Sequence, residues 1–236
     1  MKYPRSRSAS QFMVCTAIAF FIVSIFAGCS SRKNDIPSPI EQRRPFASSK
    51  APKSELRELR RLVIAPVFVM PNASDAQTQL ASIESQLEQQ ARGRLRIETV
   101  MGEEVQKKAA GLYGSRRPNF EDWVQLMDAF SGDGLLETVI LRFKERRGSR
   151  IGADSPAEVG VRYTLYRSER EPVWEASFHF RDQALSEDFL SAQNRFSSQG
   201  GRGWKGASAL LEASMDQALS ELESQREKSF VVPTNE

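Results

Sequence analysis

The sequence predicts a single α/β domain of the α+β type, with helices packed on a mixed, partly antiparallel sheet of about five strands. Three observations predict this class. An aliphatic run at residues 61–69 is typical of a strand buried on both faces. Helical patterns with a strand-like stretch between them follow, and three stretches of two-residue alternation come last. A strand–helix–strand beginning favours parallel pairing and later hairpins favour antiparallel pairing, so we expect a mixed sheet.

The first elements run from residue 61 to about residue 134. Pro66, inside the opening strand, suggests a bulge or an edge position. Residues 74–77 match a capping box that opens a helix, Gly93 closes this helix, and a short strand is expected near 95–99. The helical faces are apolar at spacings of three and four: Ala76, Leu80, Ile83, Leu87 and Ala91, then Met101, Val105 and Ala109, then Trp123, Leu126, Met127 and Phe130 in a helix capped by Asn119.

Three strands and a helix complete the predicted domain. Apolar residues alternate with others at 139–143, strictly at 159–165, and again at 174–180. The turn-forming segment 168–172 separates the last two strands and predicts a hairpin. A Gly-rich loop then leads into a final helix from Trp204 to about residue 228.

Charge and cysteine content restrict the possible partners. The 236 residues have a mean hydropathy of −0.45, which argues against a polytopic membrane protein. Residues 62–236 hold 21 basic and 26 acidic side chains, an acidic balance that disfavours nucleic acid as a ligand. The two cysteines, Cys15 and Cys29, both precede the predicted domain, so a disulfide bond cannot hold that domain together.

The N-terminus has the pattern of an export signal. Residues 1–11 are polar and basic, residues 12–28 form an uncharged run, and polar residues follow. A basic start, an apolar stretch and small residues before a cleavage site define a secretory signal. A membrane-spanning helix is the alternative, but it needs about 20 apolar residues.

Residues Ile25-Phe26-Ala27-Gly28-Cys29 resemble the lipobox of bacterial lipoproteins, with Phe26 where an aliphatic residue is usual. The resemblance implies a diacylglyceryl group on the Cys29 thiol, cleavage between Gly28 and Cys29, and acylation of the new amino group by a chain such as palmitate. Several acyl chains anchor a protein stably to a membrane. Ser30 after the cysteine implies the outer membrane, facing the periplasm. An ordinary secretory signal with an incidental cysteine is the alternative.

Four segments are therefore expected. Residues 1–28 are a lipoprotein signal peptide, and 29–55, rich in Ser, Pro and charge, are a flexible tether. Residues 56–228 are the globular domain, and 229–236 are a C-terminal tail.

No pattern in the predicted domain reaches the standard of a catalytic, metal or cofactor site. Residues 201–206 spell G-x-G-x-x-G, but no strand directly precedes them as a dinucleotide site requires. His179 is the only histidine and is expected on a strand surface, without further metal ligands. The acidic pairs at 103–104, 121–122 and 187–188 lie near predicted helix starts, where carboxylates stabilise the helix dipole.

Aromatic residues in the Gly-rich loop are the candidates for partner binding. Phe189, Phe196 and Trp204 lie in a polar context between residues 183 and 206. Such residues can anchor a partner, or they can cover an edge of the core, which is the commoner role.

Two segments resemble a further family. Arg61-Leu-Val-Ile-Ala-Pro66 is similar to the opening strand, and Tyr166–Trp174 to a hairpin, of lipoproteins with a domain like the N-terminal domain of the Tol-system propeller protein. That domain type also occurs in outer-membrane activators of peptidoglycan synthases and in curli-type secretion lipoproteins. The turn here lacks their usual Gly, and residues 134–140 lack their Gly-rich strand motif. The resemblance implies a partner-binding module without cofactor or catalysis.

We therefore expect a non-enzymatic adaptor, anchored to the membrane through Cys29, that binds another envelope protein or peptidoglycan. A subunit of an outer-membrane secretion or assembly complex is a second hypothesis. An envelope hydrolase is a third.

Overall fold

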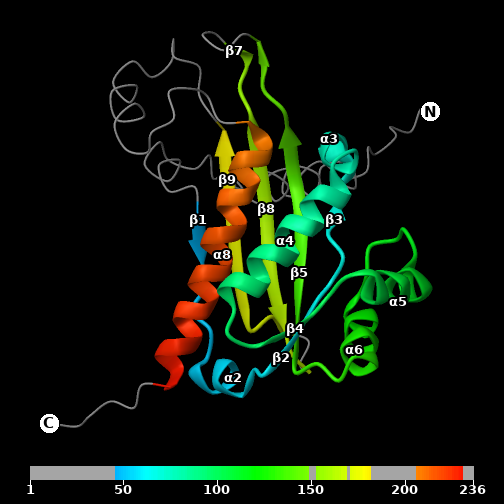
Figure 1. Ribbon diagram of the computed structural model, residues 1–236, viewed down its shortest axis with the longest axis vertical. Coiled ribbons are helices and arrows are strands. Elements are labelled where there is room, and N and C mark those ends of the chain that lie inside the picture. The colour runs from blue at the N-terminus through cyan, green and yellow to red at the C-terminus, as the bar shows by residue number, and fades with distance from the viewer. Residues whose placement is uncertain (1–45, 149–152, 169–170, 182–205, 231–236) are drawn as a thin grey trace, which may run out of the picture. The chain divides into compact units, whose positions relative to one another are not determined.

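A computed structural model describes residues 46–148, 153–168, 171–181 and 206–230. These residues form a seven-stranded mixed sheet with the order β1-β9-β8-β5-β2-β4, in which β3 also pairs with β5 (Figure 1). The strands of this sheet are β1 (Phe46–Ser48), β2 (Arg61–Ile64), β3 (Phe68–Val69), β4 (Glu98–Val100), β5 (Gly134–Lys144), β8 (Glu158–Tyr166) and β9 (Trp174–Arg181). A separate two-stranded sheet, β6 (Arg147–Gly148) with β7 (Ala153–Ser155), lies beyond the ends of β5 and β8.

The helices are α2 (Lys53–Glu58), the 3₁₀ turn η2 (Pro71–Ala73), α3 (Ser74–Gln77), α4 (Leu80–Arg94), α5 (Glu103–Tyr113), α6 (Phe120–Ala129) and α8 (Ala207–Phe230). β2 runs parallel to β4 and β5, whereas β5, β8 and β9 pair antiparallel. The prediction of a mixed sheet with packed helices is thus confirmed. The number of strands is larger than expected because β1 and β3 are too short to give a periodic signal.

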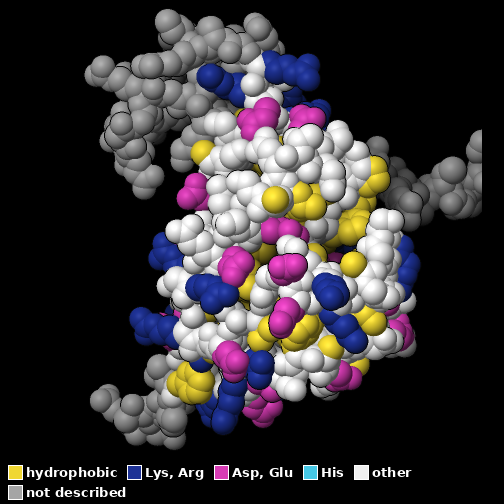
Figure 2. All heavy atoms as spheres, turned by 45° about the vertical axis from the view of Figure 1, so that its right-hand side comes forward, with side chains coloured by type: hydrophobic (Ala, Val, Ile, Leu, Met, Phe, Trp, Pro, Cys, Tyr) yellow, Lys and Arg dark blue, Asp and Glu magenta, His cyan; other side chains and the backbone are white. Residues whose placement is uncertain are grey.

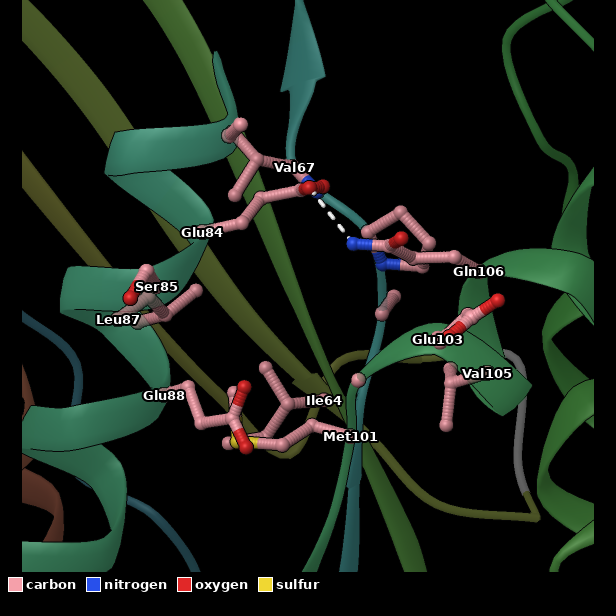
Figure 3. A pocket seen from close by; sticks show the side chains of 14 residues that line it. Ile64, Val67, Glu84, Ser85, Leu87, Glu88, Met101, Glu103, Val105 and Gln106 are labelled. Atoms are coloured by element: carbon pink, nitrogen blue, oxygen red, sulfur yellow. Dashed lines mark hydrogen bonds between the residues drawn. The ribbon is translucent and has the colours of Figure 1, made fainter. Parts of the chain in front are cut away.

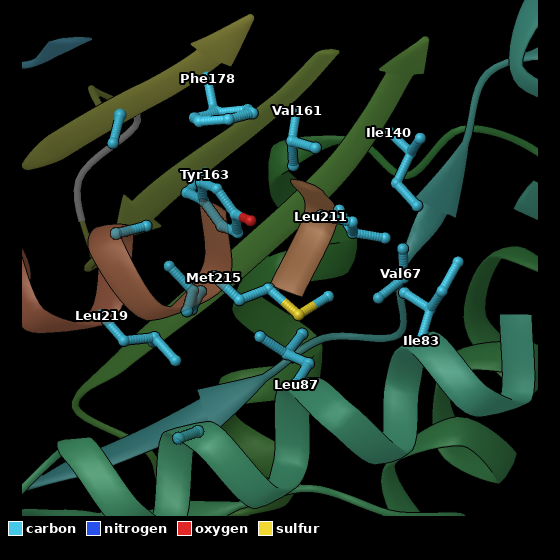
Figure 4. Packing of buried hydrophobic residues seen from close by; sticks show 14 of the residues in the cluster. Val67, Ile83, Leu87, Ile140, Val161, Tyr163, Phe178, Leu211, Met215 and Leu219 are labelled. Atoms are coloured by element: carbon cyan, nitrogen blue, oxygen red, sulfur yellow. The ribbon is translucent and has the colours of Figure 1, made fainter. Parts of the chain in front are cut away.

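The sheet separates two hydrophobic cores. The larger core lies between one sheet face and helices α2, α4 and α8. In Figure 1, α4 and α8 cross the front of the sheet and α2 lies at its lower end. Figure 4 shows Met215 of α8 and Leu87 of α4 meeting over this face, where the Tyr163 hydroxyl lies 2.8 Å from Ser214 Oγ. The smaller core lies on the opposite face, where α5 and α6 pack on Val63 and Leu135. The described residues thus supply two hydrophobic cores, one on each face of the sheet.

β5 is buried on both faces at its start, which explains why its beginning was missed. We expected this strand from about residue 139, yet it begins at Gly134, and residues 134–140 are all buried. Because helices pack on both sides of this part of β5, the strand has no solvent-exposed face, and the sequence shows no alternation of apolar and polar residues. The strands expected at 159–165 and 174–180 are confirmed. Burial alternates along β9, whereas in β8 seven of the nine residues are buried and only Arg162 and Tyr166 are partly exposed.

Pro66 interrupts the first predicted strand. β2 and β3 both pair with β5, but the register changes from Leu62↔Gly134 to Phe68↔Val139. One extra residue therefore lies between the paired segments, within residues 65–67, of which Pro66 is the middle one. The expectation of a bulge there is confirmed.

The predicted capping box at 74–77 is wrong. The 3₁₀ turn from Pro71 to Ala73 already brings the chain into helical geometry, so Ser74 is the first residue of α3 and makes no capping bond. The helix is interrupted after Gln77, resumes at Leu80, and continues past Gly93 to Arg94.

Two elements begin inside the segment expected to be tether. Phe46 of β1 pairs with Phe178 of β9, and α2 starts at Lys53. The side chain of Gln225 in α8 bonds the Ser49 carbonyl and the Ala51 amide, each at 3.0 Å. A polar composition concealed this order because backbone pairing and amide bonds, rather than apolar burial, hold most of the segment.

At the other end, α8 runs from Ala207 to Phe230 and so extends two residues into the expected C-terminal tail. None of the described helices is both long and apolar enough to cross a membrane.

Candidate functional site

A cleft opens where the chain changes from one face of the sheet to the other. β2 leads to α3 and α4, which pack on the larger core, whereas β4 leads to α5, which packs on the smaller core. Because β2 and β4 are parallel, their carboxyl ends lie side by side between α4 and α5. In open α/β sheets ligands bind in the crevice at such a topological switch point.

The cleft encloses about 260 Å³ (Figure 3). Its apolar lining includes Ile64, Val67, Leu87, Met101 and Val105, and its carboxylates are Glu84, Glu88 and Glu103. Figure 2 shows acidic side chains gathered over the middle of the molecular face where α4 and α5 lie. The volume lies near the lower limit of small-molecule sites and fits one side chain better than a cofactor.

Glu84 is the central polar group of the cleft. Its Oε1 atom accepts the Val67 backbone N–H at 3.1 Å, and its Oε2 atom accepts the Gln106 side-chain amide at 2.8 Å (Figure 3). Burial raises the pKa of Glu84, and the bond from Val67 opposes that rise only in part. Both donors are neutral, so the carboxylate has lost hydration without gaining a cation among the described residues.

The other two carboxylates make the cleft acidic. Glu88 pairs with Arg92 one turn along α4, at 2.7 Å. Glu103 lies in the first turn of α5, and no described cation pairs with it. The α5 N-terminus contributes only about half a positive charge. The cleft therefore favours a cationic group.

The described part of the cleft has no catalytic set. Ser85 supplies the only side-chain hydroxyl in the lining, and no histidine or cysteine lies beside it. The described residues contain no group of three or more His, Cys, Asp or Glu that could hold a metal ion.

His179 lies on β9, far in sequence from the cleft, and its side chain is 60% exposed. Its Nε2 atom is 3.9 Å from a carboxylate oxygen of Glu158. The expectation of a surface histidine opposite the buried Phe178 is confirmed.

The acidic pairs occupy helix starts where the structure describes them. Glu103 and Glu104 open α5. Asp122 in the first turn of α6 accepts the Asn119 N–H at 2.7 Å, while the Asn119 side chain accepts the Asp122 N–H at 2.9 Å. Arg116 donates two bonds of 2.6 Å to Asp122, and this contact lowers the pKa of Asp122. The pair at 187–188 lies outside the described residues.

The predicted functional residues are not placed by the structure. Gly28, Cys29, Phe189, Phe196 and Trp204 all lie outside the described residues, as does most of the G-x-G-x-x-G segment. Trp123 and Met127 are buried in the smaller core, which confirms the core role expected from their spacing.

Sequence reasoning missed the cleft itself. The available signal was Glu84, which lies four residues after Leu80 and three before Leu87, at the border of the predicted apolar face of α4. A carboxylate at that border is common on surface helices, so the position alone did not single it out.

The fold defines a class, a mixed α+β domain whose cleft lies at the ends of parallel strands. No protein-family model and no curated protein matches the sequence. Similar solved structures include the PelC dodecamer from Paraburkholderia phytofirmans, with TM-score 0.47, 15% identity, and coverage of 75% of this chain and 96% of that one. They also include lipoprotein GNA1162 from Neisseria meningitidis, with TM-score 0.37, 13% identity, and coverage of 59% and 99%. A third is protein XCC0632 from Xanthomonas campestris, with TM-score 0.27, 12% identity, and coverage of 73% and 82%.

One of these three neighbours is thus a bacterial lipoprotein. All three scores are below 0.5, so the likenesses carry no argument about activity, partner or assembly. The resemblance to the Tol-propeller N-terminal domain type stays a prediction.

Proposed function

We propose that this chain is an envelope lipoprotein, anchored through Cys29, whose domain is a non-catalytic binding module. In this proposal the cleft between α4 and α5 holds a basic side chain of another envelope protein. The observation that carries the proposal is Glu84, a carboxylate desolvated inside a cleft and bonded only to neutral donors among the described residues. A partner cation would supply the charge that this group lacks.

The shape of the cleft suits a lysine or arginine side chain. The long methylene stem of such a residue can lie against Ile64, Met101 and Val105 while its charged end reaches Glu84 and Glu103. An arginine can in addition form paired bonds with a carboxylate. A bulky cofactor has too little room, and an anionic ligand such as nucleic acid would meet the carboxylates.

The lipid anchor would give the module its advantage. A tethered domain meets partners in the same membrane at a high effective concentration, so a shallow one-residue cleft can suffice for function. Placement in the outer membrane, facing the periplasm, follows from Ser30 as a further part of the proposal.

Site-specific photo-crosslinking in intact cells tests the binding role. A photoreactive residue at Ser85, in the cleft, should capture an envelope protein, and the captured peptide should contain Lys or Arg beside the cross-linked position. The same residue at Ser82, exposed on α4 outside the cleft lining, is the matched control and should not capture this protein.

The adduct at Ser85 should also disappear when Glu84 is replaced by Gln, because the amide keeps the size but not the charge. Capture that is equal at Ser82, or capture that Glu84→Gln leaves unchanged, would overturn the assignment of the cleft.

A further inference from the structure

The sheet face that carries α5 and α6 is uncovered by any described helix at its far end. The antiparallel register places three rows of side chains there: Lys144–Glu158–Arg181, Arg142–Gly160–His179, and Val139–Arg162–Ser177. Directly paired residues project from the same face. This face is the one that holds Leu135 and Tyr166, against which α5 and α6 pack at the near end.

These rows form a basic patch, defined here as Arg142, Lys144, Arg162, His179 and Arg181. Four of its members are permanent cations, and Glu158 is the one carboxylate in the rows. The side chains of Arg142 and Lys144 are 53% and 58% exposed. The patch is thus strongly positive and open among the described residues, although residues 62–236 as a whole are acidic.

Glu158 organises the patch rather than neutralising it. Its side chain is only 12% exposed and lies 3.3 Å from Arg142, 3.8 Å from Lys144 and 3.9 Å from His179. Glu158 balances one of the four cations, and Glu137, in the adjoining row Glu137–Thr164–Glu175, balances Arg162. Two cations are left over at the outer end of the patch, Lys144 and Arg181. The charge left over points to an anionic surface.

The path of the chain places this patch near the predicted anchor. β1 pairs antiparallel with β9, with Phe46 opposite Phe178, so the chain enters the sheet next to His179. Only sixteen residues of the sequence separate Cys29 from Phe46. Arg43 and Arg44 are among these residues, so this stretch of the sequence is itself basic next to β1.

We propose that the basic patch binds the anionic lipid head groups of the membrane to which the chain is tethered. A head-group surface meets only this end of the domain. Acidic side chains farther away are screened, because charges interact over only about 8–10 Å at physiological salt. A long polyanion would instead extend beyond the basic patch and contact the acidic surface of the rest of the domain, which would repel it. The argument from the tether rests on the proposed anchor at Cys29.

Vesicle sedimentation tests the inference with a chain that lacks the anchor. Residues 30–236 contain both cores, so the fragment is expected to fold. A net surplus of two cations at about fivefold per cation (about 1 kcal/mol each) predicts about 25-fold tighter binding to phosphatidylcholine vesicles containing phosphatidylglycerol than to pure phosphatidylcholine. Lys144→Gln with Arg181→Gln should weaken that binding about 25-fold, whereas Arg142 still pairs with Glu158.

A gain of binding provides the sharper test. Glu158→Gln removes the one negative charge of the patch and should strengthen binding about fivefold, a change that misfolding cannot imitate. The control, Lys107→Gln with Lys108→Gln on the exposed side of α5, should leave binding unchanged.

No gain with Glu158→Gln, or an equal loss in the α5 control, would overturn the proposal. Binding to heparin without binding to vesicles would overturn it as well, because the patch would then serve a soluble polyanion. Since this chain lacks Cys29 and the test does not involve Glu84, failure here would leave the proposed anchor and cleft standing.

Discussion

Replacing Glu84 with Gln should stabilise the protein at neutral pH. The amide keeps the shape of the side chain: its carbonyl can accept the Val67 N–H, and Gln106 can turn its own amide to accept the new N–H. Only the charge is lost. Because burial raises the pKa of Glu84 above 4.5, the folded protein binds a proton there more tightly than the unfolded chain does.

The effect on stability therefore depends on pH in a defined direction. The stability of the natural protein falls as pH rises from about 4.5 through the raised pKa, because the unfolded state releases the proton first. The variant has no such loss. The two proteins should be equally stable at pH 4, and the variant should be more stable at pH 7, by about 1.4 kcal/mol for each pKa unit by which burial raises the Glu84 value.

Urea unfolding followed by tryptophan fluorescence at both pH values measures this difference. Trp174 is buried in the larger core and Trp123 in the smaller core, so the fluorescence follows the unfolding of both cores. Glu212→Gln, at an exposed carboxylate of α8, is the control and should show no pH-dependent gain. A Glu84→Gln variant less stable than the natural protein at pH 7 would refute the reasoning, since it would mean that a cation already balances the cleft.

Four further substitutions test the fold. Glu137 on β5 is only 4% exposed, and burial raises its pKa. Glu137→Gln should therefore stabilise the protein at pH 7 but not at pH 4. A loss of stability at pH 7 would show that nearby arginines outweigh the desolvation of Glu137. Asn119→Ala removes the cap of α6 and should cost about 1 kcal/mol in urea unfolding, and an unchanged midpoint would contradict that role. Gly134→Ala places a methyl group 3.2 Å from the Tyr166 carbonyl oxygen and should lower the free energy of unfolding by about 1–3 kcal/mol. Gly93→Ala, in open space on α4, should instead raise it by about 0.5–1 kcal/mol. Similar effects at both positions would contradict the packing around Gly134.

The sequence predicts strands and helices best where one face of the element is exposed to solvent and the other is buried. β9 follows this rule. In β8 the apolar residues alternate in the sequence although most of its residues are buried, so residues 159–165 and 174–180 could both be assigned from alternation. The start of β5 could not, because helices bury both its faces and alternation is lost. β1 was missed for a different reason: three residues are too few for a period, and their order depends on a partner strand 130 residues away.

The cleft could not be predicted because its lining comes from three separated segments. The segments are 64–67, 81–88 and 101–106, and each carboxylate taken alone resembles an ordinary surface residue. Only the pairing of β2 with β4 brings α4 and α5 to the same place. The basic patch was hidden in the same way, since its cations lie on three strands and meet through register.

Attachment to the membrane through Cys29 is the central claim, because both the effective concentration at the cleft and the placement of the basic patch depend on it. Mass spectrometry of the protein isolated from its native membrane tests this claim most directly. The claim predicts a chain that begins at Cys29 and carries the mass of a diacylglyceryl group on sulfur, with or without an amide-linked acyl chain. An unmodified Cys29, or a chain that still retains residues 1–28, would contradict it.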